Sequence, residues 1–232
     1  LEDHIDKWFK KPLDNSYSCV WLDATYTSVL SSMGGYSNRL YGKSIAVLVA
    51  IAVNASGQRE VLNFKICDGE SKANWQSFLE DLKEKGLERS ELWVSDDHKG
   101  LRKALMESYT GQPHQRCMVH WRRNLKNMLP QEKHYEYLPL ASNSIKARSI
   151  DEFDEYYDSL IALSSKDKND KLNDFLKRSR VDITSYQLFP PEYWSKIRST
   201  NIIERLNKEL RAREKPISVF MTYNSIKQIY GY

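Results

Sequence analysis

The sequence has no apolar run long enough to span a membrane. Its longest, Ile45–Val53, has the length and β-branched composition of a strand. The N-terminus shows no signal-peptide pattern, and Leu1 is not an initiator methionine. We therefore expect a fragment or a processed chain that makes no membrane contact.

Cysteine is also scarce. The three cysteines, Cys19, Cys67 and Cys117, are far apart and odd in number, which favours a reducing compartment over a disulfide scaffold. With 41% hydrophobic and 28% charged residues, the composition is that of an ordinary soluble protein and excludes wholesale disorder. A length of 232 residues suits one large domain, or one domain carrying an insertion.

A strong net charge is likewise absent, because the formal total is only +4. The charge is unevenly spread, since seven basic and only three acidic residues fall between Lys196 and Lys215. Such a run is usually a solvated helix face. It becomes a nucleic-acid contact if the fold places it beside an active site.

The first half of the chain alternates strand and helix signals. A helix is expected to end near Pro12, within Ile5–Leu13. Asn54–Gly57 is typical of a hairpin turn. The predicted strands are Tyr17–Tyr26, Ser44–Val53, Glu60–Ile66 and Glu91–Ser95, and the predicted helices are Ser71–Gly86 and a second one after Lys99. Three meandering strands followed by alternation predict a mixed sheet, not a sandwich or an all-parallel sheet.

Two carboxylates stand at chemically suggestive positions. Asp23 lies mid-strand among core residues, where a lone carboxylate is costly and should be paired, protonated or bound to a metal. The alternative is a surface-facing Asp on an edge strand. Asp96 ends the apolar strand Leu92–Val94, where α/β sheets gather ligands and a carboxylate suits a metal or phosphate. Here the alternative is that Asp96 or Asp97 caps the following helix.

Cys117 and His120 have the spacing of half a zinc site and precede a basic helix with Arg122, Arg123 and Lys126. No second pair stands at a comparable spacing. A packed cysteine and a hydrogen-bonded histidine are therefore favoured over structural zinc.

The segment Pro130–Pro191 is polar and is predicted to be helical after about Ile145. Ser149 and Glu152 form a capping box. The amphipathic stripe comprises Ile150, Phe153, Tyr157, Leu160 and Ile161, and a further helix is marked by Leu172, Phe175 and Leu176. This pattern predicts an all-α insertion with its own small core.

A strong helix is predicted over Thr200–Arg213, and its buried stripe is predicted to be Ile202, Ile203, Leu206 and Leu210. Glu204 lies at the edge of that stripe, one turn from Lys208 and two from Arg211. Glu204 is either a functional carboxylate or the reciprocal partner of an Asn201 cap, and spacing alone does not decide between them.

Four motifs in this order resemble the Mutator-type DDE transposases of bacterial insertion sequences. They are Trp21–Tyr26, Ser95-Asp96 with His98–Leu101, Gln115–Cys117 with Val119-His120, and Ser199–Asn201 with Ile203–Asn207. Trp8 with Pro12-Leu13 also looks like the segment that precedes the first strand in that family. The resemblance covers nearly the whole chain.

The resemblance implies an α/β fold with a ribonuclease-H-like mixed-sheet core and an all-α insertion. Its expected divisions are a linker at 1–16, the first core part at 17–129, the insertion at 130–191 and the final core helices at 192–232. Asp23, Asp96 and Glu204 would be the catalytic and metal-binding triad. Cys117 and His120 match a family signature with a structural or DNA-positioning role. Strand alternation sends only one of Asp96 and Asp97 toward the site.

The same resemblance implies two Mg²⁺ ions, replaceable by Mn²⁺, and DNA strand cleavage and strand transfer at transposon ends. The partners would be double-stranded DNA, from transposon ends and target, and further copies of the chain assembled on it. Recognition of specific ends would belong to a region outside these residues. Cytoplasmic, nucleoid-associated localisation in a bacterium is expected.

The residues expected to hold the DNA backbone are Arg116, Arg122, Arg123, Lys126, Arg198, Arg205, Lys208 and Arg211. Two alternatives remain open: another ribonuclease-H-like DNA endonuclease, or a non-catalytic domesticated DNA-binding derivative. The Cys-x-x-His motif disfavours the first, and retention of all three acids disfavours the second.

Overall fold

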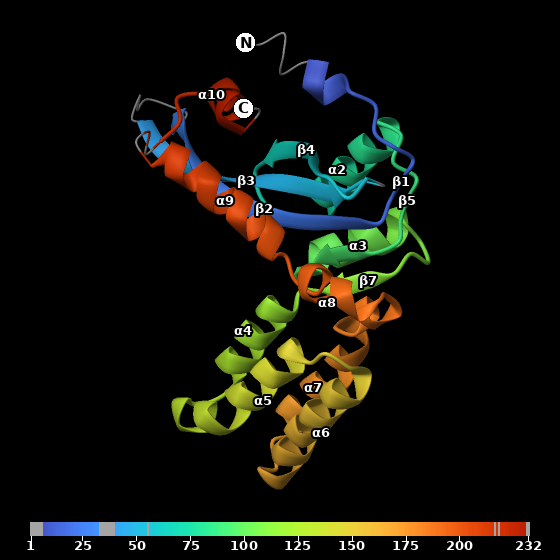
Figure 1. Cartoon of the computed structure of the whole chain (residues 1–232). Coiled ribbons are helices and arrows are strands. Elements are labelled where there is room, and N and C mark those ends of the chain that lie inside the picture. Colours follow the sequence, from blue (N-terminus) through green and yellow to red (C-terminus); the bar gives the residue numbers. More distant parts are fainter. Residues whose placement is uncertain (1–6, 33–39, 55, 216, 218, 231–232) are drawn as a thin grey trace. The chain divides into compact units, whose positions relative to one another are not determined.

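The computed structural model describes residues 7–32, 40–54, 56–215, 217 and 219–230 (Figure 1). The chain forms two compact units. The first comprises residues 1–91, 98–112 and 201–232, and the second comprises residues 92–97 and 113–200. Both units contain strands and helices, with antiparallel pairing in the first and a parallel pair in the second, so the chain is a mixed α/β protein.

The first unit is built on an antiparallel sheet of β2 (Cys19–Ser32), β3 (Leu40–Val53) and β4 (Arg59–Cys67). The predicted hairpin of β3 and β4 around Asn54–Gly57 is confirmed. Strands β2 and β3 extend beyond the predicted strands and pair as far as Ser32 and Leu40. Residues 45–52 of β3 are all buried, which anchors the sheet in the core. Before β2, residues 7–10 are helical, as predicted for the end of that segment; Ile5 lies outside the described residues.

Helices cover both faces of this sheet. Residues paired directly across antiparallel strands share a face, so Asp23, Val49 and Phe64 face one side and Ala24, Leu48 and Lys65 the other. The helix α2 (Lys72–Glu84) covers the second side, where Lys65 Nζ lies 2.8 Å from Asp81 Oδ2. The helix α9 (Asn201–Glu214) covers the first.

Three further elements complete this unit. A two-stranded parallel sheet joins β1 (Ser16–Tyr17) to β5 (Arg89–Ser90). The helix α3 (Lys99–Ser108) packs against α2, and α10 (Tyr223–Tyr230) follows α9. Neither the small sheet nor α10 was indicated by a clear sequence pattern, because two-residue strands and eight-residue helices are too short to show a period.

The start of α3 approaches the start of α2 so closely that only glycine fits at position 100. A Cβ built on Gly100 would lie 2.9 Å from the backbone nitrogen of Lys72 and 3.2 Å from the backbone oxygen of Glu70. Backbone atoms cannot move aside as a side chain can. We therefore expect Gly100→Ala to lower the free energy of unfolding in urea by about 1–3 kcal/mol.

The matched control is Gly69→Ala. A Cβ at Gly69 meets nothing within 4 Å, so this variant should stay within about 0.5 kcal/mol of the wild type. Equal destabilisation by the two substitutions would show that loss of glycine flexibility, and not the close approach of the two helices, sets the cost.

The second unit places a short parallel pair beside a group of helices. The pair is β6 (Trp93–Ser95) and β7 (His114–Arg116). The helices are α4 (Met118–Met128), α5 (His134–Lys146), α6 (Ile150–Lys166), α7 (Asp170–Asp182) and α8 (Pro191–Ile197), with 3₁₀ turns at Gln131–Lys133 and Ser185–Leu188.

An aromatic core holds these helices together. The Trp121 ring of α4 stacks on Tyr157 of α6 at 5.6 Å between centroids, and Phe153 stacks on Tyr157 at 5.1 Å. The buried Trp121 indole N–H donates to Ser179 Oγ of α7 at 3.0 Å. The predicted cap of α6 is present, since the Glu152 backbone N–H donates to Ser149 Oγ at 3.1 Å. The stripe is narrower than predicted, because Ile150 is exposed and Ile161 only half-buried.

One helix begins earlier than predicted. Helicity starts at His134, and α5 continues through Pro139, although proline removes a backbone hydrogen bond there. The prediction that helices begin only after about Ile145 is therefore wrong. The buried residues Tyr137, Ala141 and Ser144 show that packing against neighbouring helices outweighs the local cost of Pro139.

All three cysteines are buried free thiols. Among the described residues, every helix is too short or too polar to cross a bilayer.

Candidate active site

Asp23 sits on the sheet face of the first unit that α9 covers. Its carboxylate is half-buried, and Oδ2 accepts a hydrogen bond from Asn207 Nδ2 at 3.4 Å. Two residues along the same face, the buried Thr25 Oγ1 accepts one from the Arg211 guanidinium at 3.3 Å. The Asp23 carboxylate is therefore paired, as expected, and its partner is a neutral amide on a helix distant in sequence.

These two contacts fix how α9 lies on β2. Asn207 and Arg211 are one helical turn apart, and their partners Asp23 and Thr25 are two residues apart on one strand face. The two elements therefore run in the same direction at this point (Figure 1). Glu204 lies seven residues before Arg211, and hence on the same helix face, one turn ahead of Asn207.

The buried stripe of α9 differs from the predicted one. The buried residues are Ile203, Asn207 and Leu210, whereas Ile202 and Leu206 are only half-buried. The helix is rotated so that a polar residue, Asn207, occupies the buried position beside Asp23. Hydrophobic periodicity cannot anticipate this arrangement, because the partner that makes burial of Asn207 favourable belongs to a strand almost the whole chain away.

Asp96 and Asp97 follow β6 in the second unit, and both are half-buried. Asp97 Oδ2 lies 3.1 Å from the Arg116 guanidinium at the end of the neighbouring β7. The Arg116 side chain is only 4% exposed and packs 5.5 Å over the Phe175 ring. Asp97 therefore has a structural partner within its unit.

The buried position of Arg116 contradicts the prediction that it contacts DNA. This residue was expected to hold the DNA backbone, but its guanidinium is buried against Asp97 and Phe175. A buried arginine cannot contact a phosphate on the surface of its unit. We therefore assign Arg116 to positioning Asp97 and omit it from the proposed DNA contacts.

Cys117 and His120 form an internal polar cluster. Cys117 Sγ accepts hydrogen bonds from the backbone N–H and the hydroxyl of Thr200, both at 3.3 Å. Burial alone would raise the pKa of the Cys117 thiol, but hydrogen bonds from His120 and Thr200 outweigh it, and the pKa is lowered. Cys117 is therefore buried and hydrogen-bonded to both His120 and Thr200 within the second unit.

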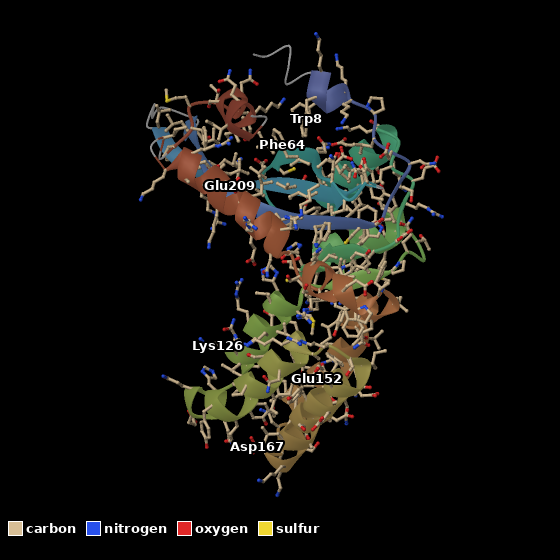
Figure 2. The ribbon with its side chains drawn as sticks, viewed as in Figure 1. Trp8, Phe64, Lys126, Glu152, Asp167 and Glu209 are labelled. Carbon is tan, nitrogen blue, oxygen red and sulfur yellow. The ribbon has the colours of Figure 1, made fainter. Side chains whose placement is uncertain are left out.

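The remaining basic residues differ in exposure. Arg123 and Lys126 on α4 are exposed (Figure 2 labels Lys126), as are Arg205, Lys208 and Arg211 on α9. Arg122 is half-buried and donates to Ser142 Oγ at 2.9 Å. Arg198 is half-buried and donates to the Ala147 carbonyl at 3.3 Å, and burial lowers its pKa.

Two functional candidates were not identified from the sequence: Asn207 beside Asp23, and Arg116 as the partner of Asp97. Asn207 belongs to one of the quoted motifs, which is the signal that could have identified it. Among the described residues, no three His, Cys, Asp or Glu side chains form a group that could hold a metal ion. Asp23 and Glu204 belong to the first unit and Asp96 to the second.

Comparison with known proteins gives a consistent result. A family model described as "Transposase, Mutator family" matches residues 1–231. The transposase for insertion sequence element IS256 in transposon Tn4001 of Staphylococcus aureus is 33% identical over 244 residues, covering 100% of this chain and 58% of the relative. The transposase for IS1081 of Mycobacterium tuberculosis is 30% identical over 237 residues, covering 100% and 54%.

A third relative, the transposase for IS1201 of Lactobacillus helveticus, is 29% identical over 231 residues, covering 98% of this chain and 59% of the relative. The chain thus spans little more than half the length of these curated relatives. A Drosophila P element transposase strand transfer complex contains a chain with a TM-score of 0.47 and 12% identity, at 100% coverage of this chain and 80% of that one.

Proposed function

Because the chain belongs to the Mutator family of transposases, we propose that it is the catalytic part of an enzyme that cuts DNA at transposon ends and joins the strands to target DNA. Under this proposal the sheets form a ribonuclease-H-like core, divided into 17–129 and 192–232. The helices within 130–191 are an insertion, and residues 1–16 lead into the core.

The observation that carries the proposal is the pairing of β2 with α9. The Asn207–Asp23 hydrogen bond holds α9 against the strand bearing Asp23, and Glu204 lies one helical turn before Asn207 on the same helix. Asp23 and Glu204 are far apart in sequence, and neither is fully buried, so both remain reachable by water and ligand.

The residues proposed to bind Mg²⁺ are Asp23, Glu204 and Asp96. They fit this ion chemically, because all three offer hard carboxylate oxygens and are half-buried. Two bound Mg²⁺ ions, or Mn²⁺ in their place, would supply an activated oxygen nucleophile and stabilise the leaving oxygen. Asn207 orients the Asp23 carboxylate through its amide, and Arg116 pairs with Asp97.

The proposed DNA contacts are the basic residues that remain after Arg116 is removed: Arg122, Arg123, Lys126, Arg198, Arg205, Lys208 and Arg211. The exposed ones among them present charge to the phosphate backbone, which carries most of the affinity in protein–DNA binding. We further propose that copies of the protein assemble on the DNA, since two ends must be joined to one target.

The test is metal-dependent nicking of supercoiled plasmid by this chain. Nicks are expected with Mg²⁺ or Mn²⁺ and not with Ca²⁺ or EDTA, because Ca²⁺ binds carboxylates without the compact octahedral geometry of Mg²⁺. Asp23→Asn should remove nicking while plasmid binding in EDTA stays unchanged. Nicking that persists in EDTA would overturn the proposed metal chemistry. Binding with no nicking under any metal would favour a non-catalytic DNA-binding protein.

A further inference from the structure

We propose that a hollow beside β4, the edge strand on the far side of β3 from Asp23, binds an unpaired nucleotide of a DNA strand. The hollow has a volume of about 660 Å³ and is lined by four segments: residues 9–12, β4, the end of α2, and α10. All four belong to the first unit, so the site is complete within it.

The apolar part of the hollow is aromatic. The rings of Trp8 and Phe64 stack at 5.7 Å between centroids, and Phe9 lies 4.9 Å from Phe64 (Figure 2 labels Trp8 and Phe64 side by side). Phe64 is buried beneath these rings, whereas Phe9 is half-exposed and Tyr223 is 44% exposed. The accessible aromatic surface therefore belongs to Phe9 and Tyr223, which enter from opposite ends of the chain.

The rim of the hollow is positively charged. Four lysines line it, Lys10, Lys65, Lys85 and Lys227, against the two acids Asp81 and Glu84. The Lys65–Asp81 pair is internally neutral, which leaves three cations against one anion. Lys227 Nζ lies 5.7 Å over the Phe9 ring, and Lys85 Nζ lies 5.1 Å over the Trp8 ring. An anionic ligand with a planar body matches this combination of cations and rings.

A buried amide gives the hollow a hydrogen-bonding group. Asn63 lines it and is only 4% exposed, and its Oδ1 has no hydrogen-bond partner among the described residues. Such a group costs about 1–3 kcal/mol when left unpaired. The edge of a nucleobase presents the N–H donors that an amide oxygen needs.

A peptide strand suits this place less well. The register of β4 is irregular opposite Ala50 and Ile51, and Lys85 Nζ donates to the Leu62 carbonyl at 2.7 Å. A bulge and a lysine on a strand edge both oppose the addition of another strand. Duplex DNA suits it less well too, because its bases remain stacked and cannot offer their faces to Phe9 and Tyr223.

The experiment measures binding of a fluorescent single-stranded oligonucleotide of about eight nucleotides, and of the same sequence as duplex, in EDTA. Lys227→Gln should weaken single-strand binding about threefold or more and leave duplex binding unchanged. The slope of log binding constant against log salt concentration for the single strand should fall in magnitude by about 0.7. Asn63→Leu should weaken single-strand binding about two- to tenfold while the melting temperature stays level or rises, since the unpaired amide is removed. Lys177→Gln, at an exposed lysine of α7, is the matched control and should change neither.

The proposal is overturned if both variants bind the single strand as the wild type does, or lose single-strand and duplex binding equally. It is also overturned if an acidic peptide, and not the oligonucleotide, displaces the probe. Free deoxynucleotide should compete only weakly, because the flanking phosphates contribute to binding of the strand. Single-strand binding is measured without metal. Failure of that binding therefore does not test the proposed nicking activity, and loss of nicking does not test the proposed single-strand site.

Discussion

Glu204→Gln is expected to reduce metal-dependent nicking at least about a hundredfold while leaving the fold intact. The substitution preserves side-chain size and removes one negative charge from a residue proposed to balance two dications. Without metal, the free energy of unfolding should stay near that of the wild type or rise slightly, because carboxylate repulsion is relieved. Nicking is measured with Mg²⁺, and unfolding in urea without it.

The alternative for Glu204 is a capping role beside Asn201. The helix begins at Asn201 itself, so Glu204 lies in the first turn but one position later than a reciprocal cap requires. Gln serves in such a cap as well as Glu does. Near-normal nicking by a well-folded Glu204→Gln variant would therefore return Glu204 to capping.

The matched control lies on the same helix. Glu209 is exposed on α9 (Figure 2) and lines a separate shallow hollow with Ile51 and Val61. Glu209→Gln makes the same change of charge in the same helix, five residues beyond Glu204 and therefore on a different helix face. It should leave nicking within about twofold of the wild type. If the two variants lose activity together, the net charge of α9 and not a specific ligand at position 204 controls nicking.

Local patterns predicted the elements whose signal is contained in a short window. The alternating residues of β2, the β-branched run of β3 and the capping box of α6 each specify structure within about a dozen residues. The family resemblance was carried by short motifs as well, and the match over residues 1–231 supports it. The predicted site residues could be located by motif, but not placed relative to one another.

The features that local patterns did not predict depend on contacts between residues remote in sequence. The Asn207 position looks like a polar interruption of a buried stripe until Asp23 supplies its partner. The α5 helix passes through Pro139 because Tyr137 and Ala141 are buried by neighbouring helices. Both features depend on contacts with residues remote in sequence, and no local rule encodes them.

The second large effect is expected at Arg116. Arg116→Ala removes the partner of Asp97, the cation over Phe175 and the side-chain volume of a nearly fully buried residue. Breaking a buried ion pair from one side leaves the other charge uncompensated and typically costs 3–5 kcal/mol. Asp97 is about one-third exposed and can regain some solvation, so we expect about 3 kcal/mol, measured as a lower urea midpoint.

A double-mutant cycle separates the pair from the packing. Asp97→Asn should destabilise the protein by about 2 kcal/mol, because a buried guanidinium then lacks its counter-charge. Arg116→Met should also destabilise the protein, because Asp97 loses its counter-charge, but Arg116→Met combined with Asp97→Asn should lose less than the sum of the two single losses. Met then refills the space over Phe175 and no buried charge is left unpaired. Additive losses in the cycle would mean that the two residues do not act as a pair.

The exposed Lys126 supplies the comparison that distinguishes positioning from DNA contact. Lys126→Ala removes a surface cation, so it should weaken plasmid binding and flatten its salt dependence with no change in the urea midpoint. Arg116→Ala should do the reverse: the midpoint falls, while plasmid binding by the still-folded protein keeps the wild-type salt slope. If Arg116→Ala instead keeps its stability and loses salt-dependent binding, Arg116 contacts DNA after all, and the Asp97 pair is incidental to its role.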